Sequence, residues 1–278
     1  MNEQSFPARL HVVFARDAAN AVVFRRGPTK QVATYLWDRS SDRFQIGQWL
    51  KGRIYERRAD LSPDGKHLLY FAMNGKWQSE TRGSWTAVSN TPYLKALDLY
   101  RKGDCWEGGG LFLSNKRYWI NDRYFSKSKV LHKRSELRAD TTSRPKENFG
   151  AECTGVYYPR LLRDGWQLVE RSERGKWNSE SVFEKRVGSE WILRKIAHEQ
   201  VGAPVGKGCY WDEHEMVDKT GKAMAKPDWE WADWDTNSLV YAEKGKLFRV
   251  GLRASSIEEP SLLRDFNSDK FEELTAPY

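Results

Sequence analysis

Residues 59–71, ADLSPDGKHLLYF, place a tight turn between two stretches that suit β-strands. Within the turn, Pro63 fixes its φ at about −65°, Asp64 can accept hydrogen bonds from the backbone that follows it, and Gly65 tolerates a positive φ. The run 68–71 after the turn is apolar and aromatic, which favours a buried strand. The stretch therefore predicts two antiparallel strands joined by this turn.

The same plan recurs along the chain at roughly constant spacing. A second copy occupies residues 231–242, WADWDTNSLVYA, in which residues 232–233 match residues 59–60. Weaker copies begin near residues 12, 110 and 158. Repetition every 40–50 residues or so is typical of propeller blades. The five anchors are separated by 47, 52, 49 and 72 residues: Phe14, Leu61, Leu113, Leu162 and Trp234.

The SPDG turn at residues 62–65, followed by the run 68–71, resembles the repeat of TolB-type and WD-repeat-like β-propellers. In that family this turn joins the innermost strand of a blade to the next strand. The resemblance implies an all-β fold built as a single β-propeller. It implies little chemistry, because propellers of this kind serve as binding platforms, receptors and enzymes.

The five anchors predict five blades in one domain spanning residues 1–278. The approximate blades are 8–56, 57–103, 104–150, 151–205 and 206–278. The long last interval leaves a sixth, degenerate blade open, and its surplus includes a hairpin-like stretch at residues 210–224. A two-sheet β-sandwich is the alternative architecture. The only helical expectation is one or two turns at residues 93–100.

Composition favours a folded cytoplasmic protein. The first residues lack a basic start followed by an apolar run, and no stretch approaches the roughly 18 apolar residues that span a bilayer, so we expect no membrane partner. The odd number of cysteines, widely spaced, favours reduced thiols over disulfides or a zinc site. The three are Cys105, Cys153 and Cys209.

A net charge of +8 would favour an acidic partner if the excess gathered on one surface. Along the chain the excess is not sharply concentrated, and basic residues on a solvated face explain the same data as nucleic-acid binding. Two small basic clusters, with acids interspersed, are residues 53–58 and the set Lys127, Lys129, Lys133, Arg134 and Arg138.

The candidate ligand-binding residues are Asp60, Trp229, Trp231 and Asp233. On an extended chain, Trp229, Trp231 and Asp233 lie on one side, so two indoles beside a carboxylate could stack a sugar or clamp a peptide. Packing between blades is the favoured role of these indoles and of Trp77, Trp85, Trp106, Trp119 and Trp166. Asp60 and Asp233 match in the repeat, and paired acids are what glycoside hydrolysis requires.

No complete catalytic, metal or cofactor motif is present. His214-Glu215 resembles the start of a zinc-protease motif, but Asp218 stands where the second histidine belongs. The glycines at 108–110 are not followed by the Lys-Ser/Thr pair of a phosphate loop. They indicate an inner strand that bends or that approaches a neighbouring strand closely.

The sequence therefore favours a non-enzymatic binding or scaffold module that presents a propeller face to a protein partner. A carbohydrate-binding or glycoside-processing protein is the first alternative. Nucleic-acid binding through the basic surface is the second.

Overall fold

The computed structural model describes residues 6–28, 30–125, 127–140, 142–143, 145–173, 178–205, 207–254 and 256–278. Within these ranges the chain has twenty-two β-strands, one α-helix and one short 3-10 helix. The predicted fold class is confirmed: the protein is all-β, a β-propeller whose five blades are five separate sheets. The described residues hold no sixth sheet and no two-sheet sandwich.

The chain divides into two compact units. The large unit combines His11–Arg160 with Asp269–Tyr278, and the small unit combines the described residues up to Leu10 with Leu161–Ser268. Each unit therefore contains one long central segment and one terminal segment.

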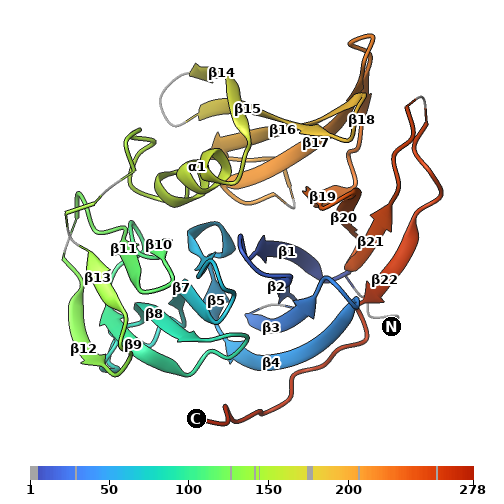
Figure 1. The fold of residues 1–278 in the computed structure, drawn as a ribbon. Helices are drawn as coiled ribbons and strands as arrows, with labels where there is room; N and C mark the ends of the chain where they lie inside the picture. The colour runs from blue at the N-terminus through green and yellow to red at the C-terminus, as the bar shows by residue number, and fades with distance from the viewer. Residues whose placement is uncertain are drawn as a thin grey trace. The chain divides into compact units, whose positions relative to one another are not determined.

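The large unit contains three of the sheets (Figure 1). The first follows the order β1-β2-β3-β4, and its strands are β1 (Arg9–Phe14), β2 (Asn20–Arg26), β3 (Gln31–Asp38) and β4 (Arg43–Lys51). The second contains β5 (Arg53–Ile54), β6 (Asp60–Leu61), β7 (His67–Met73), β8 (Ser84–Asn90), β9 (Ala96–Arg101) and β12 (Lys129–Lys133). The third contains β10 (Gly110–Ser114), β11 (Arg117–Ile120) and β13 (Arg138–Asp140).

The turn at residues 62–65 forms as predicted and also links neighbouring sheets. Gly65 has a φ of +70°, and its N–H donates to the carbonyl oxygen of Ser62 at 2.8 Å. The proline carbonyl of the turn accepts the N–H of Asp17 at 2.9 Å, and the Asp64 N–H donates to the Asn115 side chain at 2.9 Å. The turn thus ties the second blade to chain segments of the first and the third.

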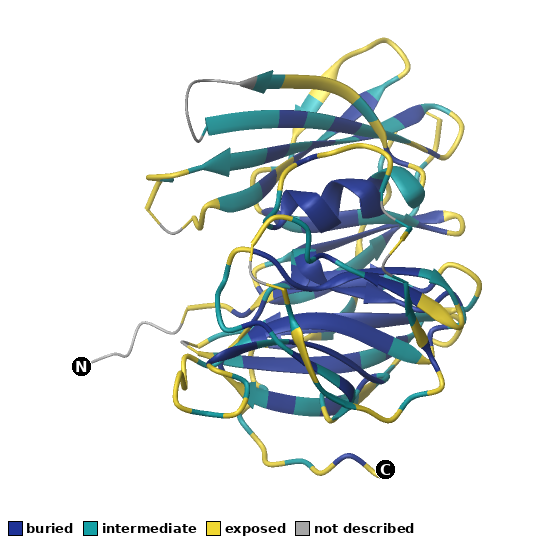
Figure 2. Cartoon of the chain, turned by 90° about the vertical axis from the view of Figure 1, so that its left-hand side faces the viewer, coloured by how far each residue is buried: buried dark blue, intermediate teal, exposed yellow. Residues whose placement is uncertain are grey.

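The core of the large unit lies where the first two sheets supply facing apolar side chains. Val22, Phe24, Leu68 and Tyr70 are almost completely buried in one cluster. The Tyr70 hydroxyl is satisfied by donating to the Leu94 carbonyl oxygen at 2.6 Å. Figure 2 shows that buried residues follow the strands while exposed residues gather in the turns.

The third sheet departs from a regular meander. After β11 the chain first forms β12, which pairs with β9 of the second sheet, and only then forms β13, which pairs in parallel with β11. One connection therefore contributes edge strands to two different sheets. Residues of these edge strands and of the connection before β12 line the cavity described below.

The small unit contains the remaining two sheets (Figure 1). The fourth sheet contains β14 (Gln167–Glu173), β15 (Asn178–Val187), β16 (Trp191–Gln200), β17 (Tyr210–Asp218) and β18 (Ala223–Ala225). The fifth contains β19 (Trp229–Asp235), β20 (Ser238–Glu243), β21 (Lys246–Val250) and β22 (Ser261–Asp265).

The predicted boundary near residue 205 does not coincide with a change of sheet. The predicted hairpin at 210–224 does form, as β17 and β18. However, β17 pairs with β16 along its whole length, so the hairpin belongs to the fourth sheet. The long last interval between anchors is therefore occupied by an extended fourth blade.

The helix α1 (Thr154–Arg163) was not expected from the sequence. The anchor Leu162 lies within this helix and not on an inner strand, where the repeat pattern predicts it. Tyr157 and Leu161 are buried four residues apart, which is helical spacing. Gly165, with φ +89°, ends the helix, so the Asp-Gly pair caps a helix and does not join two strands. The helical turns expected at 93–100 are also wrong, because β9 begins at Ala96.

The terminal segments are held by hydrogen bonds to their own units. In the large unit, the Tyr35 hydroxyl donates to the Asp269 carboxylate at 2.8 Å, and the Gln48 side chain donates to the Leu274 carbonyl oxygen at 2.8 Å. The Tyr278 hydroxyl donates to the Lys95 carbonyl oxygen at 2.5 Å. In the small unit, the N–H of Leu10 donates to the Glu230 carboxylate at 2.9 Å.

Candidate functional site

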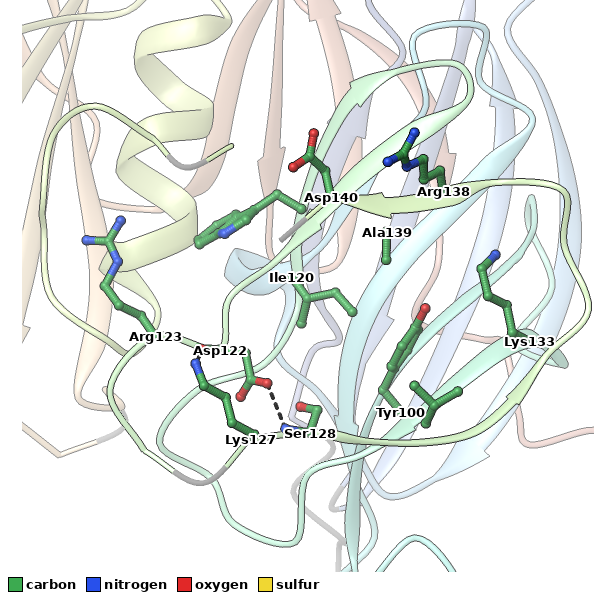
Figure 3. A pocket seen from close by; sticks show the side chains of 12 residues that line it. Tyr100, Ile120, Asp122, Arg123, Lys127, Ser128, Lys133, Arg138, Ala139 and Asp140 are labelled. Atoms are coloured by element: carbon green, nitrogen blue, oxygen red, sulfur yellow. Dashed lines mark hydrogen bonds between the residues drawn. The ribbon is translucent and has the colours of Figure 1, made fainter. Parts of the chain in front are cut away.

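A cavity of about 520 Å³ opens in the large unit between the edges formed by β9 with β12 and by β11 with β13. We call it the β9–β13 cavity (Figure 3). Its apolar lining consists of Tyr100, Trp119, Ile120, Val130 and Ala139. Its basic lining consists of Arg123, Lys127, Lys133 and Arg138, and the remaining lining residues are Asp122, Ser128 and Asp140.

The loop that follows β11 is held in place by a buried carboxylate. Glu107 accepts the backbone N–H groups of Arg123, Tyr124 and Phe125 at 2.7, 2.5 and 3.0 Å. Its second oxygen also accepts the Lys102 ammonium at 3.0 Å, and both side chains are fully buried. Three successive backbone donors are therefore satisfied by one side chain, which fixes this wall of the cavity.

Lys102 connects that carboxylate to a second one. Its ammonium also donates to Asp122 at 2.8 Å, and the other Asp122 oxygen accepts the N–H of Ser128 at 2.7 Å. Burial alone would lower the pKa of Lys102, but its hydrogen bonds to Asp122 and Glu107 outweigh burial and raise that pKa. Burial would raise the pKa of Glu107, and the backbone N–H donors with Lys102 lower it instead.

The opposite wall is organised by Asp98, which is also fully buried. Its oxygens accept the backbone N–H groups of Arg134 and Ser135, both at 2.9 Å, and the Lys133 ammonium at 3.2 Å. The Tyr118 hydroxyl donates to Asp98 at 2.8 Å and lies 2.6 Å from the Tyr100 hydroxyl oxygen. Burial opposes ionisation of Asp98, yet the donors from Ser135, Tyr118 and Lys133 hold its pKa below the ordinary value.

Replacing Asp98 by Asn is expected to destabilise the protein by about 2–3 kcal/mol at neutral pH, since hydrogen bonds to a charged group are lost. A lowered folded-state pKa gives stabilisation that is present above the unfolded value of 3.8 and is lost as the pH falls through the folded value. The difference between wild type and Asp98→Asn in urea-unfolding free energy should therefore shrink from pH 7 to pH 3. A difference independent of pH would contradict this account.

Three cations at the cavity have no carboxylate partner among the described residues. Lys127 donates to the carbonyl oxygen of Asp122, Arg123 donates to the Tyr124 hydroxyl, and Arg138 makes no side-chain hydrogen bond or ion pair with this part of the chain. Asp140 also lines the cavity, but it already pairs with the Arg117 guanidinium at 3.5 Å and accepts hydrogen bonds from Thr142 and Ser143. The cavity thus combines an apolar lining with uncompensated positive charge.

The predicted basic cluster is therefore brought to one place. Lys127, Lys133 and Arg138 all line the cavity, and among these Lys133 is the one that forms an ion pair with a described residue. Lys129 and Arg134 are exposed nearby in the sequence, on β12 and directly after it. The sequence grouped these residues as one of two basic clusters, and it predicted neither the cavity nor its apolar lining.

Beside Glu107 lie three exposed aromatic side chains, which we call the aromatic surface: Trp106, Tyr124 and Phe125. They are 50%, 50% and 47% exposed. Trp106 and Phe125 stack with ring centroids 5.8 Å apart, and the Arg123 guanidinium lies over Tyr124. The Glu107 hydrogen bonds hold the backbone of two of the three. The expectation that Trp106 packs between blades is wrong, as it is for the 52%-exposed Trp77, whereas Trp119 and Trp166 are buried as predicted.

The sequence contained a weak signal for the aromatic surface. Tyr124 and Phe125 follow Arg123 in a segment without strand alternation, where no packed face explains two adjacent aromatics. Glu107 gave no such signal, because its donors come from residues 16 to 18 positions away.

The four residues predicted for ligand binding are placed in both units. Asp60, in the large unit, is completely buried, and it accepts the N–H of Phe112 at 2.7 Å and so links β6 to β10. Asp233, in the small unit, is half-buried and accepts the Lys185 ammonium at 2.7 Å. Both carboxylates therefore already accept hydrogen bonds from within the protein. A glycosidase role for them stays a prediction.

The predicted indole pair is buried. Trp229 stacks on Tyr241 with ring centroids 4.3 Å apart, and Trp231 is 4% exposed. A bulge between the two residues interrupts the alternation that would place them on one face. Trp229 still lines a smaller cavity of about 390 Å³ in the small unit, together with Lys226 and Glu243. A stacking platform for carbohydrate stays a prediction.

Among the described residues, no group of three or more His, Cys, Asp or Glu side chains is placed to hold a metal ion. His214 is buried on β17, where it forms hydrogen bonds with Lys195 and with the Trp229 carbonyl oxygen. None of the helices in the described part of the chain has the length and apolar character needed to cross a bilayer. The three cysteines form no disulfide.

Comparison of the sequence with models of protein families finds no match, and comparison with curated proteins finds no similar sequence.

Proposed function

We propose that this protein is a non-enzymatic module that binds a protein partner through the aromatic surface. The observation that carries the proposal is the aromatic surface itself, with its Trp, Tyr and Phe side chains half exposed over a buried Glu107–Lys102 pair. Tryptophan, tyrosine and arginine dominate the binding energy of protein interfaces. Large aromatics already held in place lose little conformational entropy on binding, which favours affinity.

The charge next to the aromatic surface indicates the character of the partner. Arg123 and Lys127 lie in the same loop and lack carboxylate partners among the described residues, so a contact surface with acidic side chains would complement them. The turn motif at residues 62–65 supports membership of the TolB-type and WD-repeat-like propellers, and the composition supports a cytoplasmic location.

Replacing Trp106 and Phe125 together by serine is expected to weaken the partner complex by about 30-fold or more, because hot-spot residues contribute about 2 kcal/mol or more. The measurement is a quantitative pull-down from the native host, followed by titration of the recovered protein. Leu262→Ser, which changes a 52%-exposed leucine of the small unit, is the matched control and should retain the partner. Equal recovery of every protein by wild type and the double variant would refute the proposal.

The basic cluster favours single-stranded nucleic acid as a second candidate. Exposed aromatics next to uncompensated cations are the elements that bind bases and phosphates. This candidate predicts that wild type binds an oligothymidylate with an affinity that falls steeply with added salt. Absence of oligothymidylate binding at low salt would exclude it and leave the protein partner.

A further inference from the structure

We infer that the β9–β13 cavity binds a small organic anion that consists of a flat apolar body and one carboxylate or phosphate group. The inference concerns the cavity and does not rest on the proposed protein partner. A volume of about 520 Å³ lies within the range of roughly 300–1,000 Å³ found for small-molecule sites.

The apolar part of the lining offers few hydrogen-bonding groups to a ligand. The Tyr100 hydroxyl forms a hydrogen bond with the Tyr118 hydroxyl at 2.6 Å, so Tyr100 offers a ligand its ring and not its hydroxyl group. Ile120, Val130 and Ala139 add aliphatic surface. Such a lining favours an apolar body, and the Trp119 and Tyr100 rings favour a flat one.

The charged part of the lining favours an anion. Arg123, Lys127 and Arg138 approach the cavity without a carboxylate partner among the described residues. The two acids of the lining already have cationic partners: Asp122 accepts the Lys102 ammonium, and Asp140 pairs with the Arg117 guanidinium at 3.5 Å. The Ser128 N–H also donates to Asp122, and Thr142 and Ser143 donate to Asp140. A ligand anion would therefore meet positive charge whose neutralising partner is missing.

Arg138 is the residue we assign to the anionic group. It stands on β13, and its guanidinium has no side-chain partner in the described ranges, whereas Lys127 already donates to a carbonyl oxygen. A guanidinium presents parallel N–H donors that match the two oxygens of a carboxylate or phosphate. Both walls are held by Glu107 and Asp98, so the site is formed before the ligand arrives.

The test is calorimetric titration of the full chain with three probes of similar shape: 2-naphthoate, 2-naphthyl phosphate and neutral 2-naphthalenemethanol. We expect both anions to bind with one site per chain and the neutral probe to bind at least tenfold more weakly. Either order of the two anions supports the site, and the tighter one identifies the anionic group.

Arg138→Gln is expected to weaken binding of the better anion by tenfold or more. Lys129→Gln removes an equal charge from β12 at a residue that does not line the cavity, and it should change the affinity less than twofold. The Trp106/Phe125 double serine variant should bind the anion like wild type, which separates this site from the protein interface. Equal binding of the neutral probe, equal losses in the two charge variants, or no binding at millimolar probe would each overturn the inference.

Discussion

Replacing Glu107 by Gln is expected to lower the free energy of unfolding by about 3–5 kcal/mol, the range measured when one partner of a buried ion pair is removed. The Lys102 ammonium, which is completely buried, loses the countercharge of Glu107 and keeps that of Asp122. The amide also brings its own NH₂ group toward the three backbone N–H donors that the carboxylate accepted. Urea denaturation at neutral pH measures the change.

Glu136→Gln provides the control, because Glu136 is an exposed acid of the same unit. Its effect should stay within about 0.5 kcal/mol, as is usual at the surface. The double variant Glu107→Gln with Lys102→Met should be less destabilised than the sum of the single changes, since the unpaired buried charge is removed. A Glu107→Gln protein as stable as the Glu136→Gln control would show that the buried pair does not hold the loop.

Gly109→Ala is expected to destabilise the protein by about 2–5 kcal/mol, which combines the strain of a positive φ with that of an overpacked contact. Gly109 has a φ of +73°, and a Cβ atom there would lie 2.0 Å from the Arg58 carbonyl oxygen. Because backbone atoms of the segments around residues 58 and 109 would have to move, the pairing of β10, which begins at Gly110, is disturbed as well. Thermal and urea unfolding measure the loss.

Gly75→Ala separates the two causes. Gly75 has nearly the same φ, +70°, but nothing lies within 4 Å of the position of its Cβ. It should therefore show the backbone strain alone, about 1 kcal/mol. If both variants lose equal stability, the close approach at Gly109 has no energetic weight.

The parts of the fold that the sequence predicts are those fixed by local chemistry. The turn at residues 62–65 forms because its proline and glycine select the required φ angles. The hairpin of β3 and β4 is likewise local, because its two strands are joined by the short turn at residues 39–42, in which Asp42 has a positive φ. The close approach at glycines 108–110 followed from their lack of a side chain.

The parts that escaped prediction depend on partners distant in the sequence. Nothing in residues 129–140 indicates that β12 joins one sheet and β13 another, because each is a short strand with no strong pattern. The helix α1 is short, and a proline lies inside it at position 159, which argues against a helix when the sequence is considered alone. The cavity is lined by β12, by β13 and by the strands with which they pair, so its lining could not be predicted without that pairing.

The terminal segments have a consequence for the order in which the protein is made. Residues 11–160 leave the ribosome well before residues 269–278, so Tyr35, Gln48 and Lys95 can form their hydrogen bonds to that segment only late in synthesis. The small unit is in the opposite position, since Leu10 is synthesised 220 residues before its acceptor Glu230. Each unit is thus completed by a segment from the far end of the chain, so neither can be excised as one continuous fragment with all its contacts.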